Sequence, residues 1–442
     1  MNKFEEKDYS SEKFSFNVWK KIIKLVFKKK RYVICLIFFV TGLALLDTIY
    51  PLFNKYAIET FFSEDPDFST KVPFIISYAF IALGYLITVW GFITMAGRVE
   101  VEVAYELRDE AFKNLQVLPF AYYDKTPAGW IMARLTSDSR RLANIISWGL
   151  NDLLWGSLSM LGFLVVMFIL EWRLALIILV LLPILLIVSM YFRKKILEAY
   201  RKVRKVNSTI TANYNESFLG SKTTKTLTLE EKREKEFEKL ALEMRHFAIK
   251  AVIRSSVLFP IIMVIAYTGV MFILRIGGEF IIDQKHAFEV ATLAAFITYS
   301  TSFFDPVMQV ARILAELQQA QASAERIISL IETKPEIYDT EEVIAKYGTI
   351  LNPKFENFEP LEGDVEFENV TFSYNDKEII LENFNLKVKK GTSVALVGAT
   401  GSGKSTIVNL ICRFYEPTKG RILIDGKDYK ERSITWLHHN LG

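Results

Sequence analysis

The sequence predicts an α-helical membrane domain with six transmembrane helices, followed by an incomplete α/β phosphate-loop domain. Two observations carry this fold class. Six runs of mostly apolar residues are each long enough, at about 20 residues, for a helix to cross a bilayer. Beyond residue 363 apolar residues alternate instead, and this pattern leads into a G-x-x-x-x-G-K-S motif. Composition agrees, because 51% hydrophobic and 24% charged residues suit membrane spans joined to an aqueous part.

The apolar runs define a membrane domain, which we expect at residues 32–332. The spans cover about residues 32–53, 72–95, 145–170, 174–192, 256–276 and 287–304. Two longer intervals, 96–144 and 193–255, are rich in helix-forming Glu, Lys, Arg, Ala and Leu. We expect them to form cytosolic helical hairpins that extend the spans, interrupted at 118–129 and at Gly220. Solvated helices that only connect the spans are the alternative.

Basic residues indicate which side of the membrane is cytosolic. Lys and Arg are concentrated at 20–31 and 193–205. The short connections at 63–70, 171–173 and 277–286 contain few of them. The positive-inside rule therefore places the hairpins and both termini in the cytosol of a multi-pass protein of the cell membrane.

The N-terminal segment, residues 1–31, has a pattern of its own. From Phe14 to Phe27 aromatic and aliphatic residues alternate with lysines. This pattern is typical of an elbow helix that lies along the cytosolic membrane interface. A plain cytosolic extension of the first span is the alternative.

The soluble part begins after the sixth span. Residues 333–362 contain Pro353 and Pro360 and no sustained periodicity, so we expect a linker there. Residues 363–442 are expected to be the N-terminal part of a nucleotide-binding domain. Its expected elements are strands at 365–372, 381–388, 393–397 and 421–425 and a helix from 404 to about 414. This strand-loop-helix order is the context that a phosphate loop requires.

The motif has the residue types that bind a nucleotide triphosphate. Its glycines let successive backbone N–H groups point at phosphate oxygens, and the following helix adds a partial positive charge. Lys404 should reach the β and γ phosphates, and the Ser405 hydroxyl should ligate Mg²⁺. ATP with Mg²⁺ is thus the expected cofactor. The expected binding residues are Gly398, Ala399, Thr400, Gly401, Ser402, Gly403, Lys404, Ser405 and Thr406.

Tyr374 is a candidate for binding the base. It follows the first expected strand of the soluble part and could stack on a nucleobase. A tyrosine at a strand end is more often a packing residue, so the residue alone does not decide its role.

Composition excludes other classes of protein. The formal net charge of +4 is small for 442 residues, and the basic residues cluster near apolar spans, so nucleic acid is not an expected partner. Cys35 and Cys412 cannot form a disulfide framework, and the histidines have no metal-ligand spacing.

Further motifs follow in order along the chain. The first hairpin contains Asp124-x4-Gly129-x-Ile131-x2-Arg134-x3-Asp138, and the second contains Glu216-x3-Gly220-x4-Lys225-x-Leu227-x2-Glu230. Ala322-Ser-Ala-Glu-Arg326-Ile327 follows the sixth span, and Gly363-x-Val-x-Phe-x2-Val-x-Phe-x-Tyr374 precedes the phosphate loop. With the six spans, these residues resemble the ABC exporters of the multidrug and lipid-flippase kind, with the type IV exporter fold. Thr224 departs from the pattern, since the family usually has a β-branched aliphatic residue there.

The resemblance implies a mechanism. Tyr374 would be the base-stacking residue, and two half-transporters, identical or different, would pair so that ATP closes a shared site. The hairpins would pass this closure to the spans, which move an amphipathic drug, lipid or peptide outward. The candidate coupling residues are Tyr123, Asp124, Gly129, Arg134, Gly220 and Lys225.

The last residues, 436–442, stop short of where the family's Q-loop glutamine is expected. That glutamine, the signature loop, the catalytic glutamate strand and the switch histidine are not identifiable in the sequence. We therefore expect a fragment of an exporter half that does not hydrolyse ATP by itself. A nucleotide-gated channel, a regulatory membrane subunit and an inert truncated product are the alternatives.

Three carboxylates are candidates for a substrate cavity. Asp47, Asp152 and Asp305 lie in or near apolar spans, where a carboxylate is costly and usually faces protein or a water-filled cavity. Structural pairing or an aqueous position at the inner leaflet is the alternative.

Overall fold

The computed structural model describes residues 15–62, 67–283, 288–375 and 378–441. The chain divides into two compact units. One unit consists of Met1–Lys30, Gly97–Ser147 and Leu317–Gly442, and the other of Arg31–Ala96 and Trp148–Glu316. We describe each unit by itself. The expected N-terminal segment and the connections at 63–70 and 277–286 lie partly outside the described residues.

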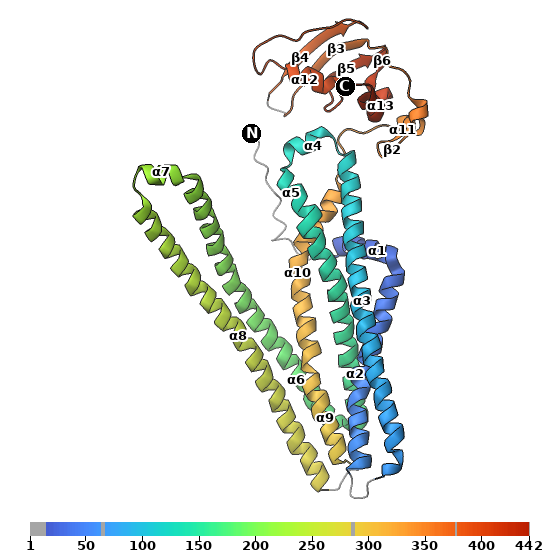
Figure 1. Cartoon of the computed structure of the whole chain (residues 1–442), viewed down its shortest axis with the longest axis vertical. Coiled ribbons are helices and arrows are strands. Elements are labelled where there is room, and N and C mark those ends of the chain that lie inside the picture. Colours follow the sequence, from blue (N-terminus) through green and yellow to red (C-terminus); the bar gives the residue numbers. More distant parts are fainter. Residues whose placement is uncertain (1–14, 63–66, 284–287, 376–377, 442) are drawn as a thin grey trace. The chain divides into compact units, whose positions relative to one another are not determined.

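Helices make up most of the described residues from 16 to 332 (Figure 1). They are α1 (Phe16–Val26), η2 (Phe27–Lys29), α2 (Lys30–Phe61), η3 (Phe68–Thr70), α3 (Lys71–Val117), α4 (Phe120–Lys125), α5 (Ala128–Ala133), the π-helical turn η4 (Arg134–Asp138), α6 (Ser139–Leu219), α7 (Ser221–Thr226), α8 (Glu230–Ile282), α9 (Val290–Ser302) and α10 (Phe304–Glu332).

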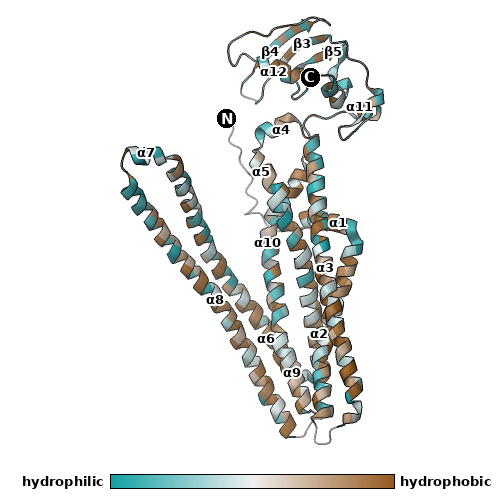
Figure 2. Ribbon diagram, viewed as in Figure 1, coloured by the Kyte–Doolittle hydropathy of each residue, from teal (hydrophilic) through white to brown (hydrophobic). Residues whose placement is uncertain are grey.

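Four helical stretches of the described residues are long and apolar enough to cross a membrane. They are Phe16–Phe61, Phe68–Val117, Ala128–Leu219 and Glu230–Ile282. The first two expected spans lie in α2 and α3, and the fifth lies in α8. Figure 2 shows apolar residues along α2 and along the part of α8 nearest α9, whereas α7 is polar.

The third, fourth and sixth expected spans do not each form one separate helix. The third and fourth both lie in α6, which is 81 residues long and changes direction at Glu171, where φ is −160° and ψ is 104°. The sixth expected span, 287–304, is not one helix. Its first residue is outside the described part, and α9, with 13 residues, ends before Phe303 while α10 starts at Phe304. Pro306 lies in the first turn of α10, where a missing N–H costs no helical hydrogen bond.

Large side chains fill the core of the second unit. Phe163 and Met167 of α6, Ile273 of α8 and Phe296 of α9 are among its buried residues. Glycine at 162 permits close contact between α6 and α2, because a Cβ there would lie 2.4 Å from Thr48 Oγ1. The Thr48 side chain of α2, next to Asp47, therefore packs directly on the α6 backbone at Gly162.

Both expected interruptions of the hairpins are confirmed. The helix α3 ends at Val117, and the short α4 and α5 follow on either side of Thr126 and Pro127. Gly220 separates α6 from α7, and its N–H donates to the Glu216 carbonyl at 2.8 Å. In Figure 1, α7 lies at the end of the hairpin that α6 and α8 form.

The described residues of the soluble part combine antiparallel strands with short helices. Its elements are α11 (Glu341–Tyr347), β1 (Gly348–Thr349), β2 (Asn352–Pro353), η5 (Phe355–Asn357), β3 (Val365–Phe372), β4 (Leu381–Val388), α12 (Lys404–Ile411), β5 (Lys419–Ile424), β6 (Lys427–Asp428), η6 (Tyr429–Glu431) and α13 (Ile434–Asn440). The strand order is β4-β3-β5-β6, and all neighbours are antiparallel.

The core of the soluble part lies between this sheet and its helices. Phe367, Ile422 and Trp436 are among the buried residues. Val343 and Tyr347 of α11 belong to the same core. The region expected as a linker, 333–362, is thus structured in this part of the chain. The sequence pattern does not reveal these elements, because a seven-residue helix and a two-residue ladder are too short to produce a sustained period.

The expected strand at 393–397 is not present as a strand. These residues make no ladder with any described strand, and Val394 and Val397 are exposed. A strand needs a neighbour to pair its backbone groups, and sequence pattern alone does not supply one. The expected helix after the loop ends at Ile411 rather than near 414, because Arg413 has the left-handed φ of 54°.

Asp425 ties the beginning of β3 to the end of β5. Its carboxylate accepts the N–H groups of Glu362, Gly363 and Asp364 at 2.8 to 2.9 Å. Burial opposes its charge, but these three hydrogen bonds outweigh burial and, with Arg432, lower the pKa of Asp425. A lowered pKa in the folded state means that Asp425 stabilises the fold above its unfolded pKa, and that this contribution is lost as the pH falls through the folded value.

Asp425→Asn should lower the free energy of unfolding of the soluble part by about 1–2 kcal/mol at pH 7. The amide cannot accept at both former oxygens, so part of the clamp is lost. The difference from the wild type should shrink below about pH 4, where the aspartate also loses its charge. Proteolysis of the detergent-solubilised chain after brief exposure to a urea series measures this at each pH. A difference that stays constant down to pH 2 would contradict the assignment.

Candidate nucleotide-binding site

The phosphate loop has the backbone conformation that its glycines permit. Gly401 and Gly403 have φ values of 88° and 85°, in the left-handed region that side chains disfavour. Gly403 is the N-cap of α12, so the loop leads directly into the helix. A Cβ added at Gly403 would lie 3.3 Å from the Ile380 and Leu381 side chains, which leaves little room for a larger residue. The expected loop and helix are therefore present, without the preceding strand.

Lys404 is folded back onto the loop. Its ammonium donates to the carbonyls of Gly398 at 3.0 Å and Ala399 at 2.7 Å, and approaches the Ser402 hydroxyl at 3.5 Å. These acceptors are neutral, and a phosphate oxygen carries charge. A triphosphate would therefore compete well for the ammonium, since charge-assisted hydrogen bonds are the stronger kind.

The two hydroxyl residues of the first helical turn face different surroundings. Ser405 is exposed, as a ligand for a nucleotide-bound Mg²⁺ must be. Thr406 is 5% exposed and accepts a hydrogen bond from the Tyr374 hydroxyl at 3.2 Å. Thr406 thus holds Tyr374 against the start of α12.

Tyr374 lies beside the loop, two residues beyond β3. Its ring packs edge-on against Phe372 and Tyr415, each with a centroid separation of 4.8 Å. Asn409 donates to its hydroxyl at 3.3 Å. The side chain is nevertheless 40% exposed, so part of the ring is open to a ligand. The structure therefore brings Tyr374 and the phosphate loop to one place.

The same place contacts the first hairpin. Tyr415 donates a short hydrogen bond from its hydroxyl to Asp124 of α4, and Phe120 stacks on Phe414 with centroids 5.0 Å apart. Burial, and then the Asp124 carboxylate, raise the pKa of Tyr415, so its proton stays in this hydrogen bond at neutral pH. Phe414 and Tyr415 were not among the sequence candidates. The sequence signal that could have identified them is this pair of adjacent aromatic residues, which directly follows the phosphate-loop helix in Arg413-Phe-Tyr-Glu-Pro.

Other coupling candidates of the first hairpin support its shape. The Tyr123 hydroxyl donates to the Leu115 carbonyl at 2.6 Å, which joins α4 to α3. Arg134 is buried, lies over the Trp130 ring and donates to Ser329 of α10. Gly129 is exposed at the start of α5 with open space around its Cβ position.

The hairpin is also tied to α10 through the motif after the sixth span. Arg326 binds Asp138 with two hydrogen bonds of 2.7 Å, and Ser323 donates to the same carboxylate at 2.8 Å. Asn114 of α3 donates to the carbonyls of Leu330 and Thr333. Residues quoted from two distant motifs, Asp138 and Arg326, are therefore direct partners.

The second hairpin, in the other unit, presents its candidates at α7. Gly220 precedes this helix, and a Cβ at Gly220 would lie 2.9 Å from the Glu216 carbonyl. Lys225 pairs with Glu230 at 3.1 Å, and Arg233 pairs with Glu216 at 2.6 Å. These exposed pairs close the turn between α6 and α8.

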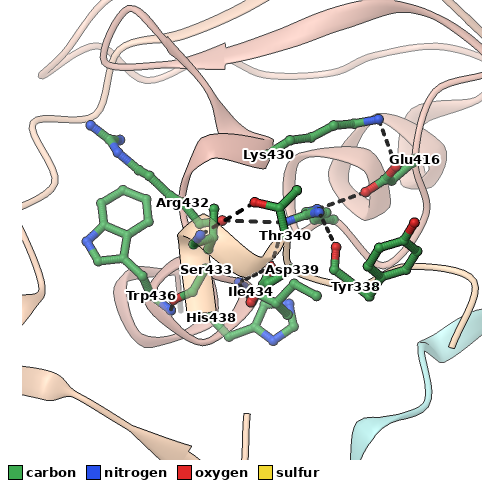
Figure 3. Close-up of polar contacts among 12 residues, drawn as sticks. Tyr338, Asp339, Thr340, Glu416, Lys430, Arg432, Ser433, Ile434, Trp436 and His438 are labelled. Atoms are coloured by element: carbon green, nitrogen blue, oxygen red, sulfur yellow. Dashed lines mark hydrogen bonds and ion pairs between the residues drawn. The ribbon is translucent and has the colours of Figure 1, made fainter. Parts of the chain in front are cut away.

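A network of ion pairs, centred on a buried arginine, lies just beyond the C-terminal end of the phosphate-loop helix α12 (Figure 3). Arg413 binds Asp339 at 3.0 Å and Glu416 at 2.9 Å, and both Arg413 and Asp339 are at least nine-tenths buried. Asp339 also accepts the N–H of Ile434, and Lys430 reaches Glu416 at 2.8 Å. Burial raises the pKa of Asp339 in spite of its partners. The network fastens the chain that leaves α10 to the end of α12 and the start of α13.

The three substrate-cavity candidates have different surroundings in the second unit. Asp47 accepts hydrogen bonds from Tyr85 and Trp155. Asp152 forms an ion pair with Arg312 at 2.8 Å. Asp305 is exposed. The structure thus brings Asp47 to the α3 and α6 helices, pairs Asp152, and gives Asp305 no place in a described cluster.

Two comparisons with known families cover most of the chain. Residues 33–307 match the family described as the ABC transporter transmembrane region. Residues 381–442 match the family described as ABC transporter. The nucleotide-site residues from Gly398 onward fall in the second match, and Tyr374 precedes it.

Curated relatives are bacterial. The chain is 29% identical over 405 residues to a putative ABC transporter ATP-binding protein of Streptococcus pneumoniae, covering 91% of this chain and 67% of the relative. It is 31% identical to a probable multidrug resistance ABC transporter ATP-binding/permease protein of Bacillus subtilis, covering 76% and 48%. It is 29% identical to an ATP-dependent lipid A-core flippase of Salmonella typhimurium, covering 78% and 56%.

The chain therefore spans between about half and two thirds of the length of these relatives. The first family match covers more than half of its 442 residues, and the second follows it in the same order as the membrane helices and the phosphate loop. The chain is a membrane protein that belongs to the ABC transporter family.

Proposed function

We propose that this chain is the ATP-binding subunit of an exporter that couples ATP to the outward movement of an amphipathic molecule. One observation carries the proposal. One of the two rings that pack on Tyr374 belongs to Tyr415, whose hydroxyl binds Asp124 in the hairpin formed by the continuations of α3 and α6. A change at the nucleotide site therefore acts directly on helices that continue into membrane spans.

The nucleotide and its metal follow from the residues of the loop. Lys404 would exchange its carbonyl partners for the β and γ phosphates of ATP, and Ser405 would supply a hydroxyl to Mg²⁺. Tyr374 would stack on the base. We infer a second subunit of the same kind as the partner, because one phosphate loop with one stacking residue forms only one wall of a nucleotide site.

Hydrolysis needs groups beyond this wall. A carboxylate must hold the metal and a further residue must orient water. We infer that residues 1–442 bind ATP without turning it over. Steady ATP hydrolysis by the purified 442-residue chain that depended on Lys404 would refute this inference.

Tyr374→Ala should weaken ATP binding by about 5- to 100-fold, because base stacking on an aromatic ring contributes about 1–3 kcal/mol. Tyr374→Phe keeps the ring and loses only the hydroxyl, so it is the matched control and should retain most of the affinity. Calorimetry with Mg·ATP and with Mg·tripolyphosphate separates base from phosphate binding. Equal losses for ATP and tripolyphosphate in Tyr374→Ala would contradict the stacking role.

Transport is tested separately, with the natural protein in inside-out membrane vesicles. An exporter should accumulate an amphipathic substrate inside the vesicles against its gradient when ATP is added outside. A nucleotide-gated channel can only equalise concentrations. Equilibration without accumulation would therefore overturn the exporter proposal.

A further inference from the structure

Asp47 lies inside the apolar helix α2, and its carboxylate has no ion-pair partner among the described residues. Tyr85 donates to Oδ1 at 2.9 Å and Trp155 donates to Oδ2 at 2.8 Å. Both oxygens serve as acceptors, which is the hydrogen-bonding role of the ionised form. Both donors are neutral, and no Lys, Arg or His of the described residues forms an ion pair with Asp47. The geometry leaves the group's charge without a counter-ion from this part of the chain.

Asp152, in the same unit, differs from Asp47 because an arginine neutralises its carboxylate. It lies three residues before Trp155 on α6, and Arg312 binds it at 2.8 Å. A carboxylate retained in a membrane span usually has a partner or a function. Asp47 has two positioned donors and no cation, so pairing within the described chain does not explain its presence.

The backbone beside Asp47 offers another acceptor. Pro51 lies inside α2 and has no N–H, so the Asp47 carbonyl lacks its helical donor. The next carbonyl, that of Thr48, accepts the Tyr299 hydroxyl at 2.5 Å. One residue thus combines a carbonyl without its i+4 donor and a carboxylate without a described cation partner, and both would favour a ligand that donates hydrogen bonds and carries positive charge.

Aromatic rings complete the surroundings. Tyr50, on the next turn of α2, packs against Tyr85 with centroids 6.4 Å apart at 83°, and its hydroxyl lies 3.0 Å from that of Tyr78. Tyr85 and Trp155 therefore contact the Asp47 carboxylate directly, and the Tyr50 ring packs against Tyr85 beside it. Such rings attract organic cations and also contact their apolar parts.

We propose that Asp47, Tyr85, Trp155 and the Pro51-released carbonyl form a binding site for a protonated amine with an apolar body. The ammonium would bind the carboxylate and the carbonyl, and the rings would cover the adjoining carbons. An anionic amphiphile would meet the Asp47 charge and be disfavoured. The assignment deepens the proposed exporter function by naming the chemical class of its substrate.

The test uses the whole chain in lipid nanodiscs without nucleotide and three dansyl-labelled probes of equal alkyl length. One ends in a primary amine, one in a neutral amide and one in a sulfonate. Energy transfer from tryptophan to dansyl reports binding. The amine should bind the wild type most tightly, and Asp47→Asn should weaken it by about 10- to 100-fold while leaving the amide probe unchanged.

Asp67→Asn is the matched control, because it removes an exposed carboxylate of the same unit at an N-cap where asparagine also serves, and it should leave amine binding unchanged. Asp47→Glu keeps the charge and should recover most of the affinity, which separates loss of the site from loss of folding. Unaltered amine binding in Asp47→Asn, equal losses in both Asp→Asn variants, or equal wild-type affinity for amine and amide would each overturn the proposal. The measurement contains no ATP, so its failure would leave ATP-driven transport to the vesicle assay.

Discussion

Lys404→Ala should weaken Mg·ATP binding by about a hundredfold, the largest effect we expect from a single change in the nucleotide site. The ammonium already makes two short hydrogen bonds to loop carbonyls, so it is held at the loop where phosphate would arrive. Hydrogen bonds to charged groups contribute about 1.5–3 kcal/mol each, and about 3 kcal/mol corresponds to a hundredfold change in affinity. Calorimetric titration of the detergent-solubilised chain measures it.

Lys389→Ala provides the control for charge. Lys389 is exposed and precedes the same loop in the sequence, so its removal changes the net charge equally but removes no expected phosphate contact. Its effect on ATP affinity should be less than about threefold, since exposed charges are screened by salt. If Lys389→Ala weakened binding as much as Lys404→Ala, the loss would reflect general electrostatics rather than the phosphate loop.

The phosphate loop could be predicted because its information is local. Nine consecutive residues, from Gly398 to Thr406, contain the glycines that adopt left-handed conformations and the lysine that binds acceptors in the loop. The long apolar runs were equally readable, because a membrane span requires only length and composition. The breaks at Pro119 and Gly220 followed from backbone chemistry of single residues.

Contacts between distant residues could not be read in this way. Tyr415 and Asp124 are 291 positions apart, and no periodicity relates them. Arg326 and Asp138 belong to two separate sequence motifs, and neither motif indicates that the two residues bind each other. The prediction of a strand at 393–397 was wrong for a related reason. Its residues are apolar, but a strand also needs a neighbouring strand to pair with, and the local pattern does not show one.

The span count shows where composition is ambiguous. Two expected spans are merged in α6, because the turn at Glu171 involves a single residue with non-helical angles. The sixth is divided near Phe303, where a pattern based on hydropathy remains continuous. Hydropathy measures how well a segment suits lipid, and it is insensitive to a one-residue change of backbone direction.

Arg413→Ala should lower the free energy of unfolding of the soluble part by about 3–5 kcal/mol, the largest stability effect we expect. The guanidinium is 4% exposed and has Asp339, Glu416 and the Tyr338 carbonyl as partners. Removing it leaves the Asp339 carboxylate buried without its cation, and breaking a buried pair from one side costs about this much. Proteolysis after exposure to a urea series compares the variant with the wild type.

Two further measurements separate the loss of this pair from a general packing defect. Burial already raises the pKa of Asp339, and removal of Arg413 should raise it further. A carboxyl whose folded pKa lies above its unfolded value favours folding when protonated, so the deficit of Arg413→Ala should shrink as the pH falls through the folded pKa. Asp339→Asn added to Arg413→Ala should recover part of the loss at pH 7 for the same reason.

Arg421→Ala, which removes an exposed pair with Glu368, should cost less than about 1 kcal/mol. A deficit that is the same at every pH and in the double variant would show that the arginine stabilises the fold by packing alone.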